Sequence, residues 1–479
     1  MTATTKEKFD ICIIGAGSAG LSIAAGAAQL GLKTALIEKS KMGGDCLNTG
    51  CVPSKALLQA GKTAALFRKA DAFGIKAVEP DIDFSAVKDH VFRVIDAIEP
   101  NDSQERFESL GVTVIRDRAV FINRNTVIAG ERTLEAKNFV IATGSRAAIP
   151  PIPGLEHSKI LTNENIFDLR ERPEHLVIIG GGPIGIEMAQ AHRRLGSKVT
   201  VLDIAMILPK DEPELVNILK RQLKDEGIDI FEKIKIERIT HSQNNTLISV
   251  EFDEKKIDIS CSHVLIAAGR QPNIENLNLE KADVDFDRQG IKTDARLRST
   301  NKQIYAAGDV AGGPQFTHIA GYHAGIIIRN IAFKLRAKVD YTALPWVTYT
   351  DPELAHVGLT EALAIKKFGK DKVRIISWHM TENDRAQAER RTEGMIKVTA
   401  LKNGKILGAS ILAPGAGDML GMWGLALQKG LRLSDIAATI APYPTMGEIS
   451  KRVAGSWYTS QLFSERTRKI VRFLNKWVP

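Results

Sequence analysis

The sequence predicts an α/β fold built around a strand–turn–helix–strand unit that occurs twice. Three observations support this prediction: the repeat itself, a composition with 44% hydrophobic and 25% charged residues, and 39 glycines. Such a composition is typical of a folded globule rather than of a disordered or fibrous chain. No run of 18 apolar residues is present, so we expect no membrane span. At 479 residues the chain suits about three domains of roughly 150 residues each.

The repeated unit covers Asp10–Glu38 and His175–Asp203, and the two copies align without a gap at an offset of 165 positions. Each copy has an apolar run, a G-x-G-x-x-G turn, an Ala-rich helical pattern, and a second apolar run that ends in an acid. In this order the glycine pattern indicates a Rossmann-like dinucleotide-binding unit. Two complete copies in the same register make a chance pair of close-packed turns an improbable explanation.

The glycines of each turn have separate structural roles. The first allows the tight turn, the second lets a pyrophosphate approach the backbone, and the third allows close helix–strand packing. The pyrophosphate then lies on free N–H groups at the helix N-terminus. Glu38 and Asp203 end the second strands and are placed to accept hydrogen bonds from ribose hydroxyls. The six glycines are Gly15, Gly17 and Gly20 in the first copy and Gly180, Gly182 and Gly185 in the second.

Asp203 also bears on the choice of nicotinamide cofactor. A carboxylate at this position repels the 2′-phosphate of NADPH. The following segment, Ile204–Lys210, contains no arginine that would bind that phosphate. The sequence therefore favours NADH over NADPH, with Lys210 as the one nearby cation that would admit NADPH.

A cysteine pair lies in GGDCLNTGCVPSK, Gly43–Lys55, and four cysteines in all are too few for a disulfide scaffold. Pro53 suits the first turn of a helix, so Cys51 is expected at a helix N-terminus, where the helix dipole stabilises a thiolate. Lys55 follows one helical turn later and lowers the thiol pKa further. Gly50 and the preceding loop must bend for Cys46 to reach Cys51.

The alternatives for this pair are inert buried thiols or half of a zinc site. Zinc needs about four ligands. The other two cysteines, Cys12 and Cys261, belong to predicted strands that are distant in sequence, and no histidine pattern completes a site. We therefore expect no metal site.

The chain resembles the class I pyridine nucleotide–disulfide oxidoreductases, the family of dihydrolipoamide dehydrogenase, glutathione reductase and mercuric reductase. The resemblance covers almost the whole chain, and its order and spacing are specific. The motifs that carry it are the first G-x-G-x-x-G, GGDCLNTGCVPSK, FVIATGS (Phe139–Ser145), the second G-x-G-x-x-G, LIAAGRQPN (Leu265–Asn273), YAAGDV (Tyr305–Val310) and VTYTDPELAHVGLTE (Val347–Glu361).

The resemblance implies an FAD-binding domain, residues 1–155 and 280–345, that is split by an inserted NAD(P)-binding domain, residues 156–279. It also implies a C-terminal α+β dimerisation domain, residues 346–462, through which two subunits form a homodimer. Residues 463–479 then form a basic, amphipathic tail.

The resemblance also implies roles for individual residues. Cys51 is the flavin-proximal thiolate, in charge transfer with the ring, and Cys46 is the exposed interchange thiol. Lys55 lies near the flavin and pairs with Glu187, while hydride passes from NADH to FAD and electrons pass on to the Cys46–Cys51 disulfide. The implied FAD residues are Gly15, Gly17, Gly20, Glu38, Gly44, Lys55, Thr143, Gly144 and Asp309, and the implied NAD residues are Gly180, Gly182, Gly185, Glu187, Asp203 and Gly269.

The sequence departs from the family near its C-terminal end. Lipoamide dehydrogenases and glutathione reductases have a His-Pro-Thr segment whose histidine, oriented by a glutamate, protonates and deprotonates the interchange thiol. Here Tyr443 replaces that histidine, and Glu448 is present. A phenol with a pKa near 10 is a poor base at neutral pH, so dithiol exchange should lose about 10²–10⁴-fold. The alternative is that Tyr443 only packs at the interface.

Tyr443 and the segment ENDRAQAE, Glu382–Glu389, resemble the mercuric reductase branch of the family. Mercuric reductases carry a C-terminal cysteine pair and often an N-terminal metal-binding module, whereas no cysteine follows Cys261 here. We therefore expect the acceptor to be a small-molecule or protein disulfide, a metal ion or a quinone. The alternatives are a dihydrolipoamide dehydrogenase with a non-standard acid–base site, or a flavin/disulfide redox sensor or membrane-associated binding protein.

Charge and targeting signals limit where the protein is expected to act and which partners it is expected to bind. The net charge is +9, of which +4 falls in the last sixteen residues, so we expect no nucleic-acid face. The first residues show no signal-peptide core, and we expect a cytoplasmic protein. Apolar and basic residues alternate at helical spacing in the tail, a pattern that fits the anionic inner membrane surface, the protein's own dimer or a docked partner. The apolar positions are Phe463, Ile470, Val471, Leu474, Trp477 and Val478, and the basic ones are Arg466, Lys469, Arg472 and Lys476.

Overall fold

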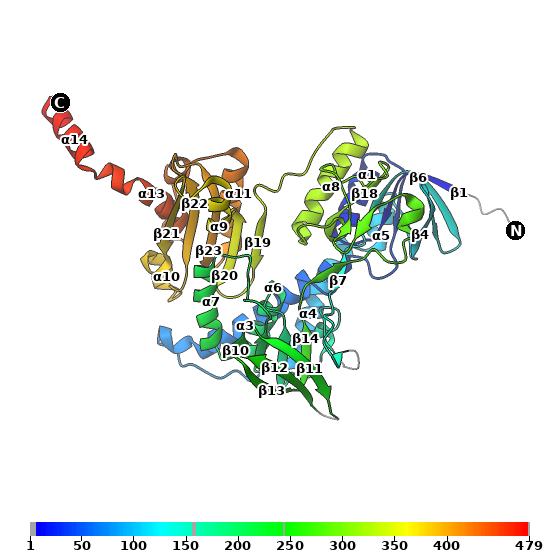
Figure 1. Cartoon of the computed structure of the whole chain (residues 1–479), viewed down its shortest axis with the longest axis horizontal. Coiled ribbons are helices and arrows are strands. Elements are labelled where there is room, and N and C mark those ends of the chain that lie inside the picture. The colour runs from blue at the N-terminus through cyan, green and yellow to red at the C-terminus, as the bar shows by residue number, and fades with distance from the viewer. Residues whose placement is uncertain (1–5, 156–159, 243–244, 478–479) are drawn as a thin grey trace.

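Three sheet-containing bodies make up the chain in the computed structural model, which describes residues 6–155, 160–242 and 245–477 (Figure 1). Two are α/β units, one with a mainly parallel sheet that has an antiparallel edge and one with a parallel four-stranded sheet, and the third is built on an antiparallel sheet. This architecture confirms the predicted fold class, two Rossmann-like units followed by an α+β region. Among the described residues, no helix combines the length and the apolar character needed to cross a membrane.

The first body is a seven-stranded sheet in the order β3-β2-β1-β6-β5-β4, with β18 paired to β6. The strands of the parallel part are rich in apolar residues because helices cover that part of the sheet. In β1, for example, Ile11–Ile14 are buried. Helices α1 (Ser18–Gln29) and α8 (Thr317–Ala332) pack together there. The strands are β1 (Lys6–Ile14), β2 (Thr34–Ile37), β3 (Thr113–Ile115), β4 (Ala119–Asn123), β5 (Thr126–Ala129), β6 (Arg132–Ile141) and β18 (Ile304–Ala306).

The second body interrupts the first, since the chain leaves the first sheet after β6 and returns to it only with β18. The short ribbon of β7 (Ser145–Ala147) and β15 (Arg270–Pro272) joins the two bodies on the outward and return passages. The parallel strands, in the order β10-β9-β8-β14, are β8 (His175–Ile179), β9 (Lys198–Leu202), β10 (Ile228–Phe231) and β14 (His263–Ile266). The antiparallel strands are β11 (Lys235–His241), β12 (Thr246–Phe252) and β13 (Lys255–Cys261), and the helices are α6 (Pro183–Arg194) and α7 (Pro213–Asp225).

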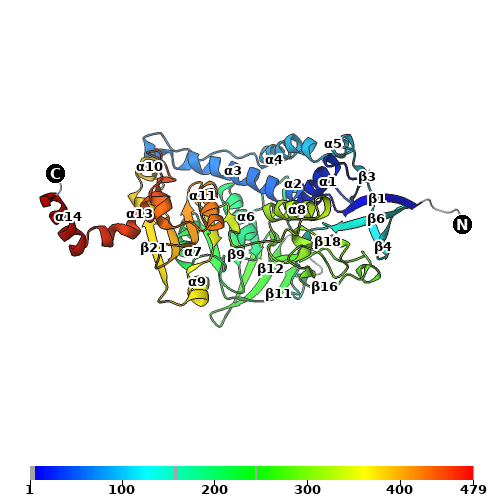
Figure 2. The ribbon, with the colours of Figure 1, turned by 90° about the horizontal axis from the view of Figure 1, so that it is seen from above.

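A long helix, α3 (Cys51–Arg68), runs from the first body along the second and packs against α4 (Phe84–Ile98) and α6 (Figure 2). The short α2 (Gly44–Asn48) precedes it. The helix therefore begins in the first body and ends among residues of the second unit, where Arg68 donates to the Arg194 carbonyl oxygen. The other elements in and beside the first body are α5 (Gln104–Ser109), β16 (Phe286–Asp287) and β17 (Gly290–Ile291).

The third body is a five-stranded antiparallel sheet in the order β19-β20-β23-β22-β21. Trp423 fills its core and donates its indole N–H to Ser450 at 3.1 Å. Its strands are β19 (Pro345–Thr348), β20 (Glu353–Gly358), β21 (Val373–His379), β22 (Met395–Leu401) and β23 (Ile406–Ala413). Its helices are α9 (Glu361–Phe368), α10 (Asp384–Ala388), α11 (Ala416–Lys429), α12 (Leu433–Ala437), α13 (Glu448–Leu462) and α14 (Glu465–Trp477), the last of which projects from the body (Figure 1).

Candidate active site

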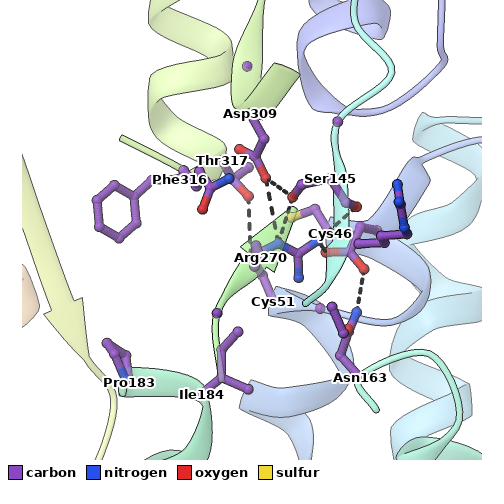
Figure 3. A pocket seen from close by; sticks show the side chains of 18 of the residues that line it. Cys46, Cys51, Ser145, Asn163, Pro183, Ile184, Arg270, Asp309, Phe316 and Thr317 are labelled. Atoms are coloured by element: carbon purple, nitrogen blue, oxygen red, sulfur yellow. Dashed lines mark hydrogen bonds and ion pairs between the residues drawn. The ribbon is translucent and has the colours of Figure 1, made fainter. Parts of the chain in front are cut away.

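One cavity of about 2790 Å³ joins the three bodies. Both glycine-rich turns, the cysteine pair and the start of β19 line it. Figure 3 shows Cys46 and Cys51 on one side of this space and Pro183 and Ile184, from the start of α6, on the other. A drug-sized ligand typically occupies about 300–1,000 Å³, so this cavity has room for two dinucleotides.

The first glycine of each glycine-rich turn excludes a side chain for the same steric reason. A Cβ on Gly15 would clash with the Ala142 carbonyl oxygen, and its φ of +107° is unfavourable for other residues. Gly180, with φ of +116°, has the same relation to the carbonyl oxygen of Ala267. The predicted requirement for glycine at Gly15 and Gly180 is therefore explained by backbone contacts alone.

The remaining predicted glycines divide into two groups. Gly20 and Gly185 do not line the cavity, because each packs against the carbonyl oxygen of the first glycine in its own turn. Gly17 and Gly44 do line it and approach each other closely, since a Cβ on Gly44 would lie 2.7 Å from the Gly17 Cα. Gly182 also lines the cavity, and a Cβ at this position would meet nothing within 4 Å. These bare backbone surfaces fit a pyrophosphate.

The acids that end β2 and β9 have equivalent environments. Glu38 accepts hydrogen bonds from the backbone N–H groups of Ala16, at 2.6 Å, and Ser40, at 2.7 Å. Asp203 accepts from the N–H groups of Gly181, at 2.6 Å, and Ala205, at 2.7 Å. Each carboxylate is thus fixed beside its glycine-rich turn at the cavity wall, and Lys210 lines the same cavity.

The cysteine pair is split between two helices, with Cys46 in α2 and Cys51 as the first residue of α3. A hydrogen bond from Cys46 is the largest of the influences that lower the pKa of the Cys51 thiol to about 6. Thr317, 3.2 Å from the Cys51 Sγ, and the Lys55 ammonium lower it further. The same Cys46–Cys51 hydrogen bond, together with burial, raises the pKa of Cys46. At neutral pH the reduced pair therefore holds a thiolate at Cys51 and a protonated thiol at Cys46.

Lys55 and Glu187 form an ion pair that connects α3 with α6. The Lys55 Nζ lies 2.8 Å from the Glu187 Oε2, and the Glu187 side chain is only 6% exposed. The backbone N–H of Tyr349, after β19, donates to the other oxygen of Glu187 at 2.9 Å, and its ring lies 4.3 Å from the Lys55 ammonium. The pair thus ties together all three bodies. Tyr349 was not among the residues that the sequence motifs singled out for a role.

A polar network surrounds the cysteine pair (Figure 3). Arg270 donates to Asp45 at 2.8 Å and to the Ser145 hydroxyl at 2.7 Å. Ser145 in turn donates to Asp309 at 2.5 Å. Burial raises the pKa of the Asp309 carboxyl. Thr143, Gly144 and Gly269, predicted from the motifs after β6 and β14, line the cavity beside this network.

Tyr443 and Glu448 lie apart from this site. Neither lines the cavity within the described part of the chain. Tyr443 is 67% exposed, and its hydroxyl donates to Asp384 at 3.0 Å. Glu448 accepts from Arg452, one turn further along α13, at 2.9 Å. Glu448 therefore does not orient Tyr443 through a hydrogen bond in this structure; Asp384 does.

The sequence indicated no role for Thr317 and no partner for Asp384, because both contact their partners across long sequence separations that no local pattern reports. His318, next to Thr317, also lines the cavity, with its Nε2 2.9 Å from the Pro345 carbonyl oxygen. Burial lowers the pKa of His318. Among the described residues, no group of three or more His, Cys, Asp or Glu side chains is arranged to hold a metal ion.

Comparisons with known proteins agree with this architecture. Residues 9–324 match the family model described as "Pyridine nucleotide-disulphide oxidoreductase", and residues 344–454 match the dimerisation domain of the same family. The chain therefore belongs to the pyridine nucleotide–disulphide oxidoreductases, and it is an enzyme of the flavoprotein disulfide reductase class. The family binds FAD and a pyridine nucleotide, which confirms the resemblance found in the sequence.

Two curated relatives represent two activities of the family. A mercuric reductase of Bacillus cereus is 36% identical over 443 residues, which cover 92% of this chain and 70% of that protein. A dihydrolipoyl dehydrogenase of Geobacillus stearothermophilus is 35% identical over 450 residues, which cover 92% of this chain and 94% of that protein. Among solved structures, the HOCl-induced flavoprotein disulfide reductase RclA from Escherichia coli matches with a TM-score of 0.83 and 29% identity, over 93% of this chain and 99% of that chain.

Proposed function

We propose that this protein is an NADH-preferring reductase that passes electrons through FAD and a Cys46–Cys51 redox disulfide to a disulfide, metal-ion or quinone-type acceptor. The observation that carries the proposal is the cysteine pair at the start of α3, which lies in the cavity that both glycine-rich turns line. The low pKa of Cys51, about 6, is typical of a reactive cysteine and not of an inert buried thiol.

The first turn fits FAD, and the second fits the nicotinamide dinucleotide. FAD, when bound, would accept hydride from NADH and supply an electron pair to the disulfide. We assign Gly15, Gly17, Gly20, Glu38, Gly44, Lys55, Thr143, Gly144 and Asp309 to FAD binding, and Gly180, Gly182, Gly185, Glu187, Asp203 and Gly269 to NAD binding. All of these residues except Gly20 and Gly185 line the shared cavity, and those two pack beneath the turns.

The two thiols have different roles in this proposal. Cys51, with the lower pKa, is the flavin-side thiolate, and Cys46 is the thiol that meets the acceptor. When the acceptor is reduced, the Cys46–Cys51 disulfide forms again, and two electrons leave the pair together with the one proton that Cys46 carries. Because the pKa of Cys46 is raised, Cys46 must lose a proton before it attacks an acceptor disulfide.

This proton bears on the nature of the acceptor. A metal ion displaces the thiol proton itself when it binds sulfur, and a quinone takes up protons as it becomes a quinol. A disulfide acceptor instead needs a base, and the pKa of the Tyr443 phenol is raised further by its hydrogen bond to Asp384. Metal-ion and quinone acceptors are therefore favoured over ordinary disulfides.

We propose that the protein is a homodimer, supported by the dimerisation-domain match over residues 344–454. Tyr443 and Glu448 lie outside the cavity of their own chain. In a homodimer we therefore expect Tyr443 to approach Cys46 of the partner subunit with its hydroxyl oxygen as a hydrogen-bond acceptor, because its one hydrogen is donated to Asp384. Glu448 would support the start of α13.

Anaerobic titration tests the proposal. Because the disulfide takes two electrons beyond those of the flavin, each subunit should consume about two equivalents of NADH, and Cys46→Ser or Cys51→Ser should consume about one. A parallel titration with NADPH reports the nucleotide preference. Consumption of only about one equivalent by the unchanged, oxidised protein would rule out the redox disulfide.

A dihydrolipoamide dehydrogenase with a non-standard acid–base site is the second candidate, favoured by the 35% identity to the Geobacillus stearothermophilus dihydrolipoyl dehydrogenase. This candidate would be supported if the unchanged protein turned over lipoamide as fast as it turns over the best of the other acceptors. In the favoured proposal lipoamide is a poor substrate, and Tyr443→His improves it by up to about 10²-fold by restoring a base.

A further inference from the structure

Helix α14 (Glu465–Trp477) has no buried residue and extends away from the third body (Figures 1 and 2). The preceding helix, α13, is anchored to that body by Ile449 and Val453, which are fully buried. The Ser464 hydroxyl then accepts from the Thr467 N–H at 3.3 Å and starts a new helix. α14 is thus a separate, capped helix that extends from the anchored helix α13.

The two sides of α14 differ sharply in chemistry. Ile470, Phe473, Leu474 and Trp477 follow the i, i+3, i+4, i+7 spacing of one helix face. They are between 47% and 67% exposed, so this apolar face is uncovered. Val478, which the sequence analysis placed with them, lies outside the described residues.

The opposite face is cationic. Arg468, Arg472 and Lys476 follow one another at intervals of four residues, and Lys469 lies beside them. Glu465 is the one acid in a helix that has five basic residues, and the fifth, Arg466, lies on the apolar side one turn before Ile470. At a rise of 1.5 Å per residue the helix is about 20 Å long, so it can lie along a bilayer surface and cannot span a hydrocarbon core of about 30 Å.

We propose that α14 is a docking surface for an anionic lipid bilayer, with its apolar face in the interface and its cations against the headgroups. Apolar burial together with attraction to anionic lipid is the combination that binds interfacial helices. A second copy of this helix is a poor occupant, because two such helices repel each other through their matching positive charge. The inference goes beyond the proposed redox chemistry, since it concerns where the enzyme works and not what it reduces.

Sedimentation of the full holoenzyme with vesicles tests this proposal. The protein should bind vesicles of phosphatidylglycerol and not vesicles of phosphatidylcholine, and high salt should release it because exposed charges are screened. The triple variant Arg468→Glu, Arg472→Glu and Lys476→Glu should lower the partition coefficient by at least about tenfold. Ile470→Ser with Leu474→Ser should also abolish binding, although it leaves the charge unchanged.

The matched control reverses three exposed lysines on another part of the third body, Lys366→Glu, Lys370→Glu and Lys372→Glu. This control has the same net charge as the triple variant and should bind phosphatidylglycerol vesicles nearly as well as the unchanged protein. Bound FAD and NADH oxidation report folding of every variant. Equal binding by both charge variants would overturn the proposal. A different result would show that α14 contacts a second copy of the chain instead. In that case the unchanged protein does not bind vesicles, and Ile470→Ser with Leu474→Ser lowers the molecular mass that the protein has in solution.

Discussion

The Tyr443 hydroxyl donates a hydrogen bond of 3.0 Å to the carboxylate of Asp384. The two residues are 59 positions apart, and the neighbouring Asn383 donates to the Thr445 carbonyl oxygen at 3.1 Å. The start of α10 is therefore bonded twice to the segment that replaces the family's acid–base histidine. The carboxylate of Asp384 raises the pKa of the Tyr443 phenol, which keeps the phenol protonated with its one hydrogen directed at Asp384.

Asp384→Asn should lower the pKa of Tyr443, because the charged acceptor that opposes phenolate formation is removed. Ultraviolet titration of phenolate absorbance measures this change, with Tyr443→Phe subtracted to isolate the one tyrosine. The same substitution made in the Tyr443→Phe background should leave the titration unchanged. A Tyr443 titration that does not move would contradict a role for Asp384 in setting its protonation.

The Cys51 thiolate should titrate with a midpoint near pH 6 in the reduced protein. Because its pKa is lowered, the thiolate is present above this midpoint and is lost as the pH falls through it. Cys46→Ala should raise the midpoint most, and Thr317→Val should raise it less, following the order of their influence on Cys51. Thiolate absorbance and the pH dependence of alkylation both report it. The reverse order of the two variants would count against the described contacts.

Asp203→Asn should shift the nucleotide preference toward NADPH. The asparagine keeps one of the two side-chain oxygens that accept from the Gly181 and Ala205 N–H groups, and it removes the charge that repels a 2′-phosphate. We expect the ratio of kcat/KM for NADH over NADPH to fall by about tenfold or more. Lys210→Met is the companion variant, and it should raise the ratio if Lys210 contacts the 2′-phosphate. An unchanged ratio in both variants would place the discrimination elsewhere.

Gly20→Ala should weaken or abolish FAD binding, since a Cβ there would clash with the Gly15 carbonyl oxygen and displace the first turn. Gly325→Ala, in the middle of α8, is the control, because a Cβ at this position would meet nothing within 4 Å. This variant should keep FAD, and the alanine should stabilise the helix by about 1 kcal/mol. Flavin absorbance after desalting measures retention. Full flavin retention by Gly20→Ala would show that the turn tolerates the displacement.

The parts of the fold that were predicted from sequence are those whose physical cause is local. Gly15 and Gly180 could be identified because a tight turn between a buried strand and a helix demands glycine, and the signal lies within six residues. The helix start at Cys51 followed from Pro53 two residues later. Such features depend on steric rules that act along the chain.

Features made by tertiary contact were not predictable from pattern alone. Thr317 reaches Cys51 across 266 positions, and Arg270 reaches Asp45 across 225. Lys55 and Glu187, 132 positions apart, were paired in advance only through the family resemblance. Asp384 was noticed within a family-like segment, yet nothing in its spacing indicated that it would bond Tyr443.

The most direct test of the central claim is turnover of Cys46→Ser with NADH and a panel of acceptors: lipoamide, glutathione disulfide, Hg²⁺, Cu²⁺ and a soluble quinone. We predict that the variant keeps FAD, is still reduced by NADH, and loses nearly all turnover with those acceptors that the unchanged protein reduces. Turnover equal to that of the unchanged protein with every acceptor would contradict the account, because the flavin would then deliver electrons without the dithiol.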